Sequence, residues 1–191
     1  MKKWLLTLIA VLLVSCIMMY KVYADEIESK FKNICYLLAK ESAETVAPAG
    51  PEYAVSDQVR EETFTRQRKL FQEWQNELKD LIKQDPKSIW ADDVQYIISV
   101  LSIENKSKQA EELEYLLKEY PDFHIEDWTK ASLVLLIPSN VSPYLARLEL
   151  CMFYKEIGDT EKLKNSCEEG IKAYPEKADK FEKILGTLSK S

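Results

Sequence analysis

The chain has 191 residues, enough for one domain or for a small domain with appendages, and it is 46% apolar and 30% charged. That composition is typical of a folded protein with a charged surface and argues against a disordered one. Only four glycines occur, with no Asn-Gly or Asp-Gly pair, which argues against an all-β fold. Residues 1–24 hold three lysines and no acid, so the rest carries 23 basic against 32 acidic residues, and nucleic-acid binding is not expected.

Residues 1–24 are predicted to be a signal peptide or membrane anchor. Two lysines precede an apolar run over residues 4–20 that would not remain in water by itself. Three outcomes stay open: the run is an uncut membrane helix, it is cut before Asp25, or the Leu-Val-Ser-Cys sequence ending at Cys16 is a bacterial lipobox. In the last case Cys16 is the lipid-attachment site. Under all three, residues 25–191 lie outside the inner membrane.

Residues 25–46 are predicted to form an amphipathic helix, followed by a linker over residues 47–56. The helix has one apolar stripe, and it either packs on the rest of the protein or lies along the membrane surface; its mixed polar face favours the first alternative. The linker holds two prolines and a glycine, which preclude a helix. The stripe consists of Ile27, Phe31, Ile34, Cys35 and Leu38.

A long helix is predicted over residues 57–84, which contain neither glycine nor proline. Its apolar seam alternates by three and four residues but lasts under three heptads, so packing against a following helix is favoured over a coiled coil. Self-association through this helix is the alternative. The seam consists of Phe64, Gln67, Phe71, Trp74, Leu78 and Leu81.

A helix-turn-helix unit is predicted between Trp90 and Pro121. Pro86 ends the preceding helix and Ser88 is expected to cap the new one, whose first turn holds two adjacent aspartates that the helix dipole favours. Consecutive helical residues point about 100° apart, so these aspartates are not expected to form a metal or acid–base pair. A further helix is predicted over residues 125–137, although its apolar stretch taken alone could be a buried strand.

The clearest signal is a helical hairpin over residues 144–177. Apolar residues follow helical spacing on both sides of Gly158 and Asp159, which supply a positive φ and a helix cap. Pro175 ends the second helix. Neither helix buries its apolar surface alone, so neighbouring helices must stack against the hairpin. The end of the chain is predicted to cap this stack through Phe181, Ile184, Leu185 and Leu188.

This hairpin resembles a tetratricopeptide repeat, a helical unit of 34 residues. Cys151, Tyr154, Gly158, Gly170 and Pro175 fall at its characteristic positions, whereas Arg147, Cys151 and Leu163 depart from the residues that the family favours there. The segment from Pro86 to Tyr96 resembles a repeat start in periplasmic lipoproteins of this type, such as the outer-membrane β-barrel assembly subunit. The spacing between Pro121 and Pro175 exceeds one repeat. The expected fold is therefore all-α: antiparallel hairpins over residues 57–191 stacked as a short, irregular superhelix.

The resemblance implies a non-enzymatic protein that binds another protein or an extended peptide in a superhelical groove. In the family the first helix of each unit lines that groove. Carried onto this sequence, Met152, Lys155 and Glu156 of the last unit and Asp93 of the preceding one are the candidate groove residues.

No chemical motif is recognised, and no cofactor or metal is expected. The chain has one histidine, His124, which is interpreted as a surface residue, and no CxxC, HExxH, phosphate-loop or G-x-S-x-G sequence. Catalysis by His124 and the acids near it is a remote alternative. Cys151 and Cys167 lie on facing helices, where a disulfide is conceivable, but two buried thiols are favoured.

The sequence thus predicts a membrane-tethered adaptor on the extracytoplasmic side of a bacterial envelope. The alternative is a self-associating structural component of the envelope that uses the 57–84 helix.

Overall fold

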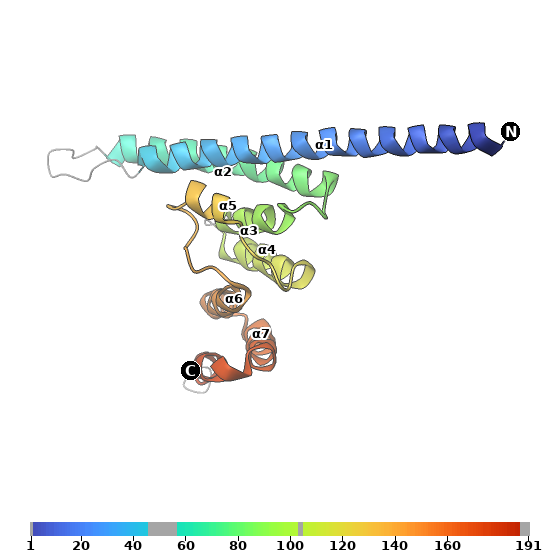
Figure 1. Ribbon diagram of the computed structural model, residues 1–191. Coiled ribbons are helices and arrows are strands. Elements are labelled where there is room, and N and C mark those ends of the chain that lie inside the picture. Colours follow the sequence, from blue (N-terminus) through green and yellow to red (C-terminus); the bar gives the residue numbers. More distant parts are fainter. Residues whose placement is uncertain (1, 46–56, 103–104, 188–191) are drawn as a thin grey trace.

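The all-α prediction is confirmed. The computed structural model (Figure 1) describes residues 2–45, 57–102 and 105–187, and every regular element in those ranges is helical. Side chains are described for residues 19, 21–43, 61–102 and 105–187.

The first helix, α1 (Lys2–Thr45), runs without a break across the predicted boundary at residue 24, and α2 (Asp57–Gln84) has the predicted bounds and lies antiparallel to it (Figure 1). The predicted apolar stripe of α1 is buried, because α2 and α5 pack against it. Helix α2 buries the C-terminal half of its seam between α1 and α3, whereas Phe64 is exposed. Within the described residues, no helix has the length and apolarity to span a membrane. The side chains of Cys16 and of nearly all of the run over residues 4–20 lie outside the described set.

Helices α3 (Ala91–Leu101) and α4 (Lys106–Glu119) form the predicted second hairpin. The expected cap at Ser88 is wrong: α3 begins at Ala91, with Trp90 in the capping position. The Ser88 N–H donates to the Asp85 carbonyl and the Ser88 carbonyl accepts from Ala91 N–H, so residues 85–90 form consecutive turns before the helix begins.

The helix predicted over residues 125–137 is much shorter than expected, because α5 comprises only Asp127–Ser132. Beyond it the chain turns, with the N–H groups of both Leu136 and Ile137 donating to the Leu133 carbonyl. This bend buries Leu133 and Ile137 in the core. A straight helix would place them on a single stripe, whereas the turns let them reach the core while α5 lies against α1.

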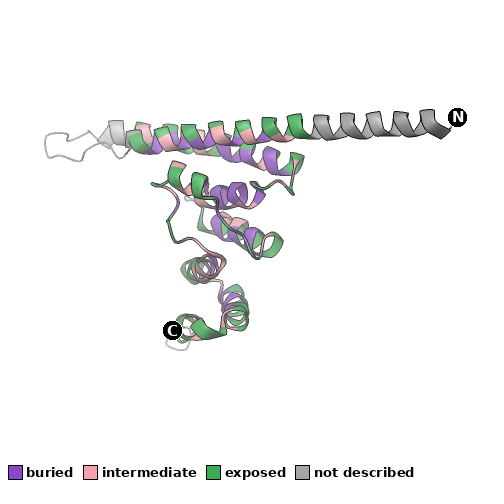
Figure 2. Cartoon of the chain, in the orientation of Figure 1, coloured by how far each residue is buried: buried purple, intermediate pink, exposed green. Residues whose placement is uncertain are grey.

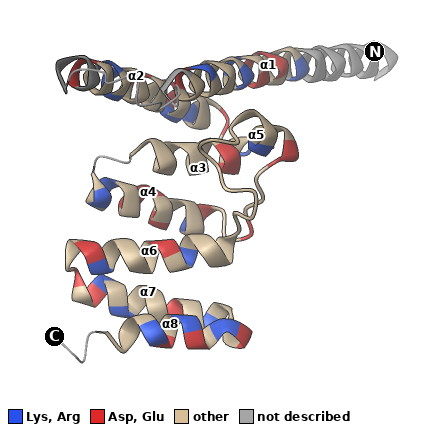
Figure 3. Ribbon diagram, turned by 90° about the vertical axis from the view of Figure 1, so that its left-hand side faces the viewer, with Lys and Arg blue, Asp and Glu red and all other residues tan. Residues whose placement is uncertain are grey.

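The hairpin of α6 (Pro143–Ile157) and α7 (Thr160–Ala173) matches the prediction. Gly158 has φ +82° and Asp159 caps α7 by accepting from Lys162 N–H at 3.0 Å. A 3-10 turn, η1 (Pro175–Lys177), leads into α8 (Ala178–Leu185), whose fully buried Phe181 covers Gly170. Figure 3 shows α3, α4, α6, α7 and α8 lying one beneath the other, and Figure 2 shows buried residues on the facing sides of successive helices.

Candidate functional site

The four residues predicted to line a groove do not form one site. Met152, Lys155 and Glu156 lie on the exposed side of α6, where the Glu156 carboxylate is 3.6 Å from the Lys106 ammonium. Asp93 is on α3 and fully buried, so its assignment to a surface groove is wrong.

Asp93 instead anchors α5. Its Oδ1 accepts from Glu126 N–H at 3.1 Å and its Oδ2 accepts from the Thr129 hydroxyl. The neighbouring Asp92 accepts from His124 N–H at 3.0 Å, so both aspartates hold the segment that leads into α5. Burial raises the pKa of Asp93 to about 7, although its hydrogen bonds from Thr129 and Glu126 lower it. The contact between α3 and α5 therefore depends on a buried carboxyl group, and burial disfavours the charged form of that group.

The other residues with reactive side chains do not gather into a catalytic or metal site. Among the described residues, no three His, Cys, Asp or Glu side chains lie close enough to hold a metal ion. His124 is exposed, and Cys35, Cys151 and Cys167 are free, buried thiols. Burial raises the pKa of the Cys35 thiol to about 12, so it stays protonated at neutral pH.

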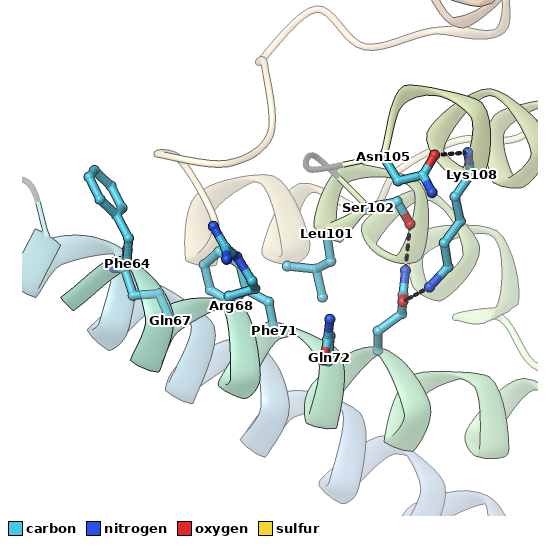
Figure 4. Close-up of a pocket in the computed structure, with 10 residues that line it drawn as sticks. Phe64, Gln67, Arg68, Phe71, Gln72, Leu101, Ser102, Asn105 and Lys108 are labelled. Carbon is cyan, nitrogen blue, oxygen red and sulfur yellow. Dashed lines mark hydrogen bonds between the residues drawn. The ribbon is translucent and has the colours of Figure 1, made fainter. Parts of the chain in front are cut away.

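A groove of about 370 Å³ lies between α2 and the adjoining ends of α3 and α4, and it is called the α2–α4 groove below (Figure 4). Three elements supply its walls: the middle of α2, the end of α3 and the first turn of α4. Its lining residues are Phe64, Gln67, Arg68, Phe71, Gln72, Gln75, Leu101, Ser102, Asn105 and Lys108.

One end of the groove is polar and ordered by hydrogen bonds (Figure 4). Gln75 donates through Nε2 to the Ile98 carbonyl at 3.0 Å and to the Ser102 hydroxyl, and its Oε1 accepts from the Lys108 ammonium at 2.8 Å. Asn105 caps α4 by accepting from Lys108 N–H at 3.0 Å. Because Gln75 is buried and satisfied on both sides of its amide, it holds the Lys108 ammonium in a fixed place.

The other end of the groove carries two aromatic side chains, with Gln67 and Arg68 between them (Figure 4). Phe64 is 52% exposed and points away from α2, while Phe71 is half-buried and Leu101 is buried (Figure 4). Phe71 is held by the neighbouring Trp74 ring, with the two centroids 6.1 Å apart. An exposed phenylalanine next to a partly covered one offers a surface on which an apolar side chain of another molecule can be buried.

The charge of the groove differs from that of the whole chain. Arg68 and Lys108 are cationic and none of the ten described lining residues is acidic, although the chain has a net charge of −6. Lys108 forms no ion pair with any described residue, and its ammonium meets the neutral Gln75 amide instead. The first turn of α4 holds no acidic residue either, although a helix N-terminus favours negative charge. The groove therefore suits a ligand that carries a carboxylate beside an apolar group.

Comparisons with protein families, with curated proteins and with solved structures found no match to this chain. The nature of the site thus rests on its geometry and its charge.

Sequence reasoning found part of this groove without recognising it. Phe64 and Phe71 were identified in the seam of a long helix, and the polar Gln67 that interrupts this seam was the available signal. Lys108 gave none, because a lysine near the start of a charged helix is indistinguishable from a surface residue until Gln75 is placed beside it.

Proposed function

We propose that this protein is a non-enzymatic, membrane-tethered adaptor that binds a segment of another protein in the α2–α4 groove. The observation that carries the proposal is the pairing of an exposed aromatic end with a cationic end that lacks acidic lining residues. The bound segment has an apolar side chain lying on Phe64 and Phe71, and an aspartate or glutamate that accepts from Lys108.

The energetics of the groove support this mode of binding. A hydrogen bond to a charged group contributes about 1.5–3 kcal/mol when it is partly shielded from water, and burial of one large apolar side chain contributes a similar amount. Together they supply about 3–6 kcal/mol, which does not by itself exceed the cost of association, so the bound segment makes further contacts along the groove and the complex is weak and reversible. The resemblance of residues 144–177 to a tetratricopeptide repeat agrees with a protein-binding role. The exposed residues Met152, Lys155 and Glu156 on α6 are a second proposed contact.

The tether in this proposal is the segment over residues 1–24, held in the membrane by its apolar run or by lipid on Cys16. Its two N-terminal lysines, with no acid before Asp25, support a location of residues 25–191 on the extracytoplasmic side of the envelope. An adaptor so placed recruits its partner to the membrane surface.

The experiment is site-specific photocrosslinking in the native cell. The photoreactive amino acid p-benzoylphenylalanine replaces Phe64 in the groove or, as a matched control, Tyr36, an aromatic residue that is 66% exposed on α1. Phe64 is expected to yield one protein adduct that Tyr36 does not, with the crosslink on a segment that contains an acidic residue. Introducing Lys108→Gln should lower the yield about tenfold, because one charged hydrogen bond is lost.

A second substitution tests whether the loss is specific to the groove. Lys118→Gln makes the same change on the same helix, at a lysine that is exposed and pairs only with the neighbouring Glu119 among the described residues. It should leave the yield unchanged. Equal capture at Phe64 and Tyr36, or equal loss with both lysine variants, would refute the groove. An adduct at Phe64 with a second copy of this chain would instead favour the self-associating structural component.

A further inference from the structure

Helix α1 joins the apolar N-terminal run to the folded body without any flexible connection. It is continuous from Lys2 to Thr45 and contains neither glycine nor proline. The apolar run ends at Tyr20, and the first core residue on α1 is Ile27, seven residues later. At 1.5 Å per residue this separation is about 10 Å along the helix axis. The body therefore begins close to the point where the run ends.

One edge of the body faces the projecting end of α1. Figure 1 shows that the end of α2, the turn from α2 to α3 and the C-terminal end of α4 all lie on that side. In Figure 2 the end of α2 reaches about as far along α1 as the first coloured turns of α1. This edge therefore lies at nearly the same height along the α1 axis as the end of the apolar run. It is displaced from the run mainly sideways, away from α1.

This edge exposes apolar side chains around a hollow. Ile89 is 74% exposed, and Tyr115 of α4 is partly exposed on the other side of a cavity of about 530 Å³ that both residues line. We call residues 85–90 and Tyr115 the α1-proximal edge.

The exposure of Ile89 is built into the fold, because the turn that carries it is fixed. Backbone hydrogen bonds close the turn at Ser88 and Ala91, and the Tyr120 hydroxyl of α4 donates to the Pro86 carbonyl at 3.2 Å. The next residue, Trp90, is buried and packs against Phe31 of α1, with the ring centroids 5.4 Å apart and the ring planes tilted by 40°. Because the Trp90 side chain is held in the core, the side chain of the neighbouring Ile89 points away from it.

We propose that the α1-proximal edge lies against the phospholipid surface, with Ile89 inserted among the headgroups. The inference rests on the tether in the proposed function, in its form as an uncut membrane helix, and it goes further by fixing how the body sits on the bilayer. Each headgroup layer is roughly 5–8 Å thick, which is comparable to the separation along α1. Transmembrane helices tilt by about 20° on average, and a tilt toward the body brings the edge into the headgroups. We assign a lipid surface as the binding partner of this edge because the unbroken helix α1 connects the edge rigidly to the membrane-embedded run.

Two exposed lysines lie on this edge, beside acidic groups. Lys87 lies in the turn, and Lys83 lies on the last turn of α2, where its ammonium is 2.9 Å from the Asp80 carboxylate. Asp92 and Glu119 also line the cavity. Long lysine side chains near an apolar contact reach lipid phosphates while the apolar groups enter the interface.

The test uses the full chain in vesicles of phosphatidylethanolamine and phosphatidylglycerol that contain a phospholipid with a diazirine near its headgroup. Flotation first shows whether the chain is bound to the vesicles. After illumination, the tryptic peptide 88–106, which contains Ile89, is expected to carry at least fivefold more lipid adduct than peptide 131–147. The second peptide contains Val134, which is 72% exposed in the segment after α5, on the far side of the body in Figure 1.

Matched substitutions identify the residue responsible. Ile89→Ser should lower the adduct on peptide 88–106 at least threefold, and Val134→Ser should leave it unchanged. Val134 is a matched control because the two residues are about equally exposed. Equal labelling of both peptides on floating vesicles would overturn the proposed edge while the tether stands. A chain that does not float with the vesicles would overturn both the edge and the tether. The binding of a partner in the α2–α4 groove would still be tested separately, by crosslinking at Phe64.

Discussion

Replacing Asp93 by asparagine should remove a pH dependence from the stability of the fold. Asp93 is fully buried, and its carboxyl group accepts from Glu126 N–H and from the Thr129 hydroxyl. Asparagine has the same shape. Its oxygen can accept from Glu126 N–H, and its amide can donate to the Thr129 hydroxyl, which rotates to accept. The substitution therefore keeps both contacts and resembles the protonated carboxyl group.

The magnitude follows from the raised pKa. Burial raises the pKa of Asp93 from 3.8 to about 7, so between these values the native state binds more protons than the unfolded state. Wild-type stability must then fall as pH rises from about 4 to 7, and it stays reduced above that range. At about 1.4 kcal/mol per pKa unit, the loss from this one group is about 4 kcal/mol. Asp93→Asn should thus be more stable than wild type at pH 8 and nearly equal to it at pH 4.

The assay is urea unfolding of the full chain in mild detergent at pH 4, 6 and 8, followed by tryptophan fluorescence. Trp90 and Trp128 are suitable reporters because their rings lie 6.1 Å apart, between α3 and α5, beside the segment that Asp93 anchors. Asp92→Asn is the control, since it makes the same change at a half-buried neighbour and should retain the wild-type slope. Parallel pH dependence of wild type and Asp93→Asn would refute the reasoning.

Three further substitutions test the C-terminal hairpin, each by urea unfolding against wild type. Gly170→Ala should destabilise the protein by up to about 2 kcal/mol, because the added Cβ would lie within 2.6 Å of the Phe181 ring. In a Phe181→Leu background the same change should be neutral or stabilising. An equal loss of stability in both backgrounds would contradict the packing of Phe181 on Gly170. Gly158→Ala should cost about 1 kcal/mol, since φ is +82° there, and no loss would argue against the left-handed turn. Asp159→Ala should cost about 1 kcal/mol through loss of the cap on α7, whereas Asp159→Asn should not; equal losses would rule out capping as the cause.

Several parts of the fold could be predicted because their signals are local. Gly158 and Asp159 specify a turn through their own backbone and capping preferences, and the structure has that turn where the sequence predicts it. The bounds of α2 follow in the same way from a stretch without glycine or proline that ends before Pro86. The stripe from Ile27 to Leu38 predicts an apolar face, and that face is buried.

Other parts were mispredicted because distant residues decide them. Ser88 has the chemistry of a cap, but the turns that bring Trp90 onto Phe31 delay the start of α3. The helix predicted over residues 125–137 ends at Ser132, and the turns that follow bury Leu133 and Ile137 in the core. Asp93 has the pattern of a surface residue in a helix, yet α5 covers it.

The sequence by itself determined that the chain is helical, the bounds of α2, the turn between α6 and α7, and which faces are apolar. Those properties depend on residues within a few positions of one another. The tertiary structure alone decided the α2–α4 groove and the α1-proximal edge. Gln75 and Lys108 are 33 residues apart and meet only because α2 lies across the start of α4. Whether Ile89 or Phe64 stays exposed depends likewise on which helices pack beside it, and packing of distant helices has no counterpart in local spacing.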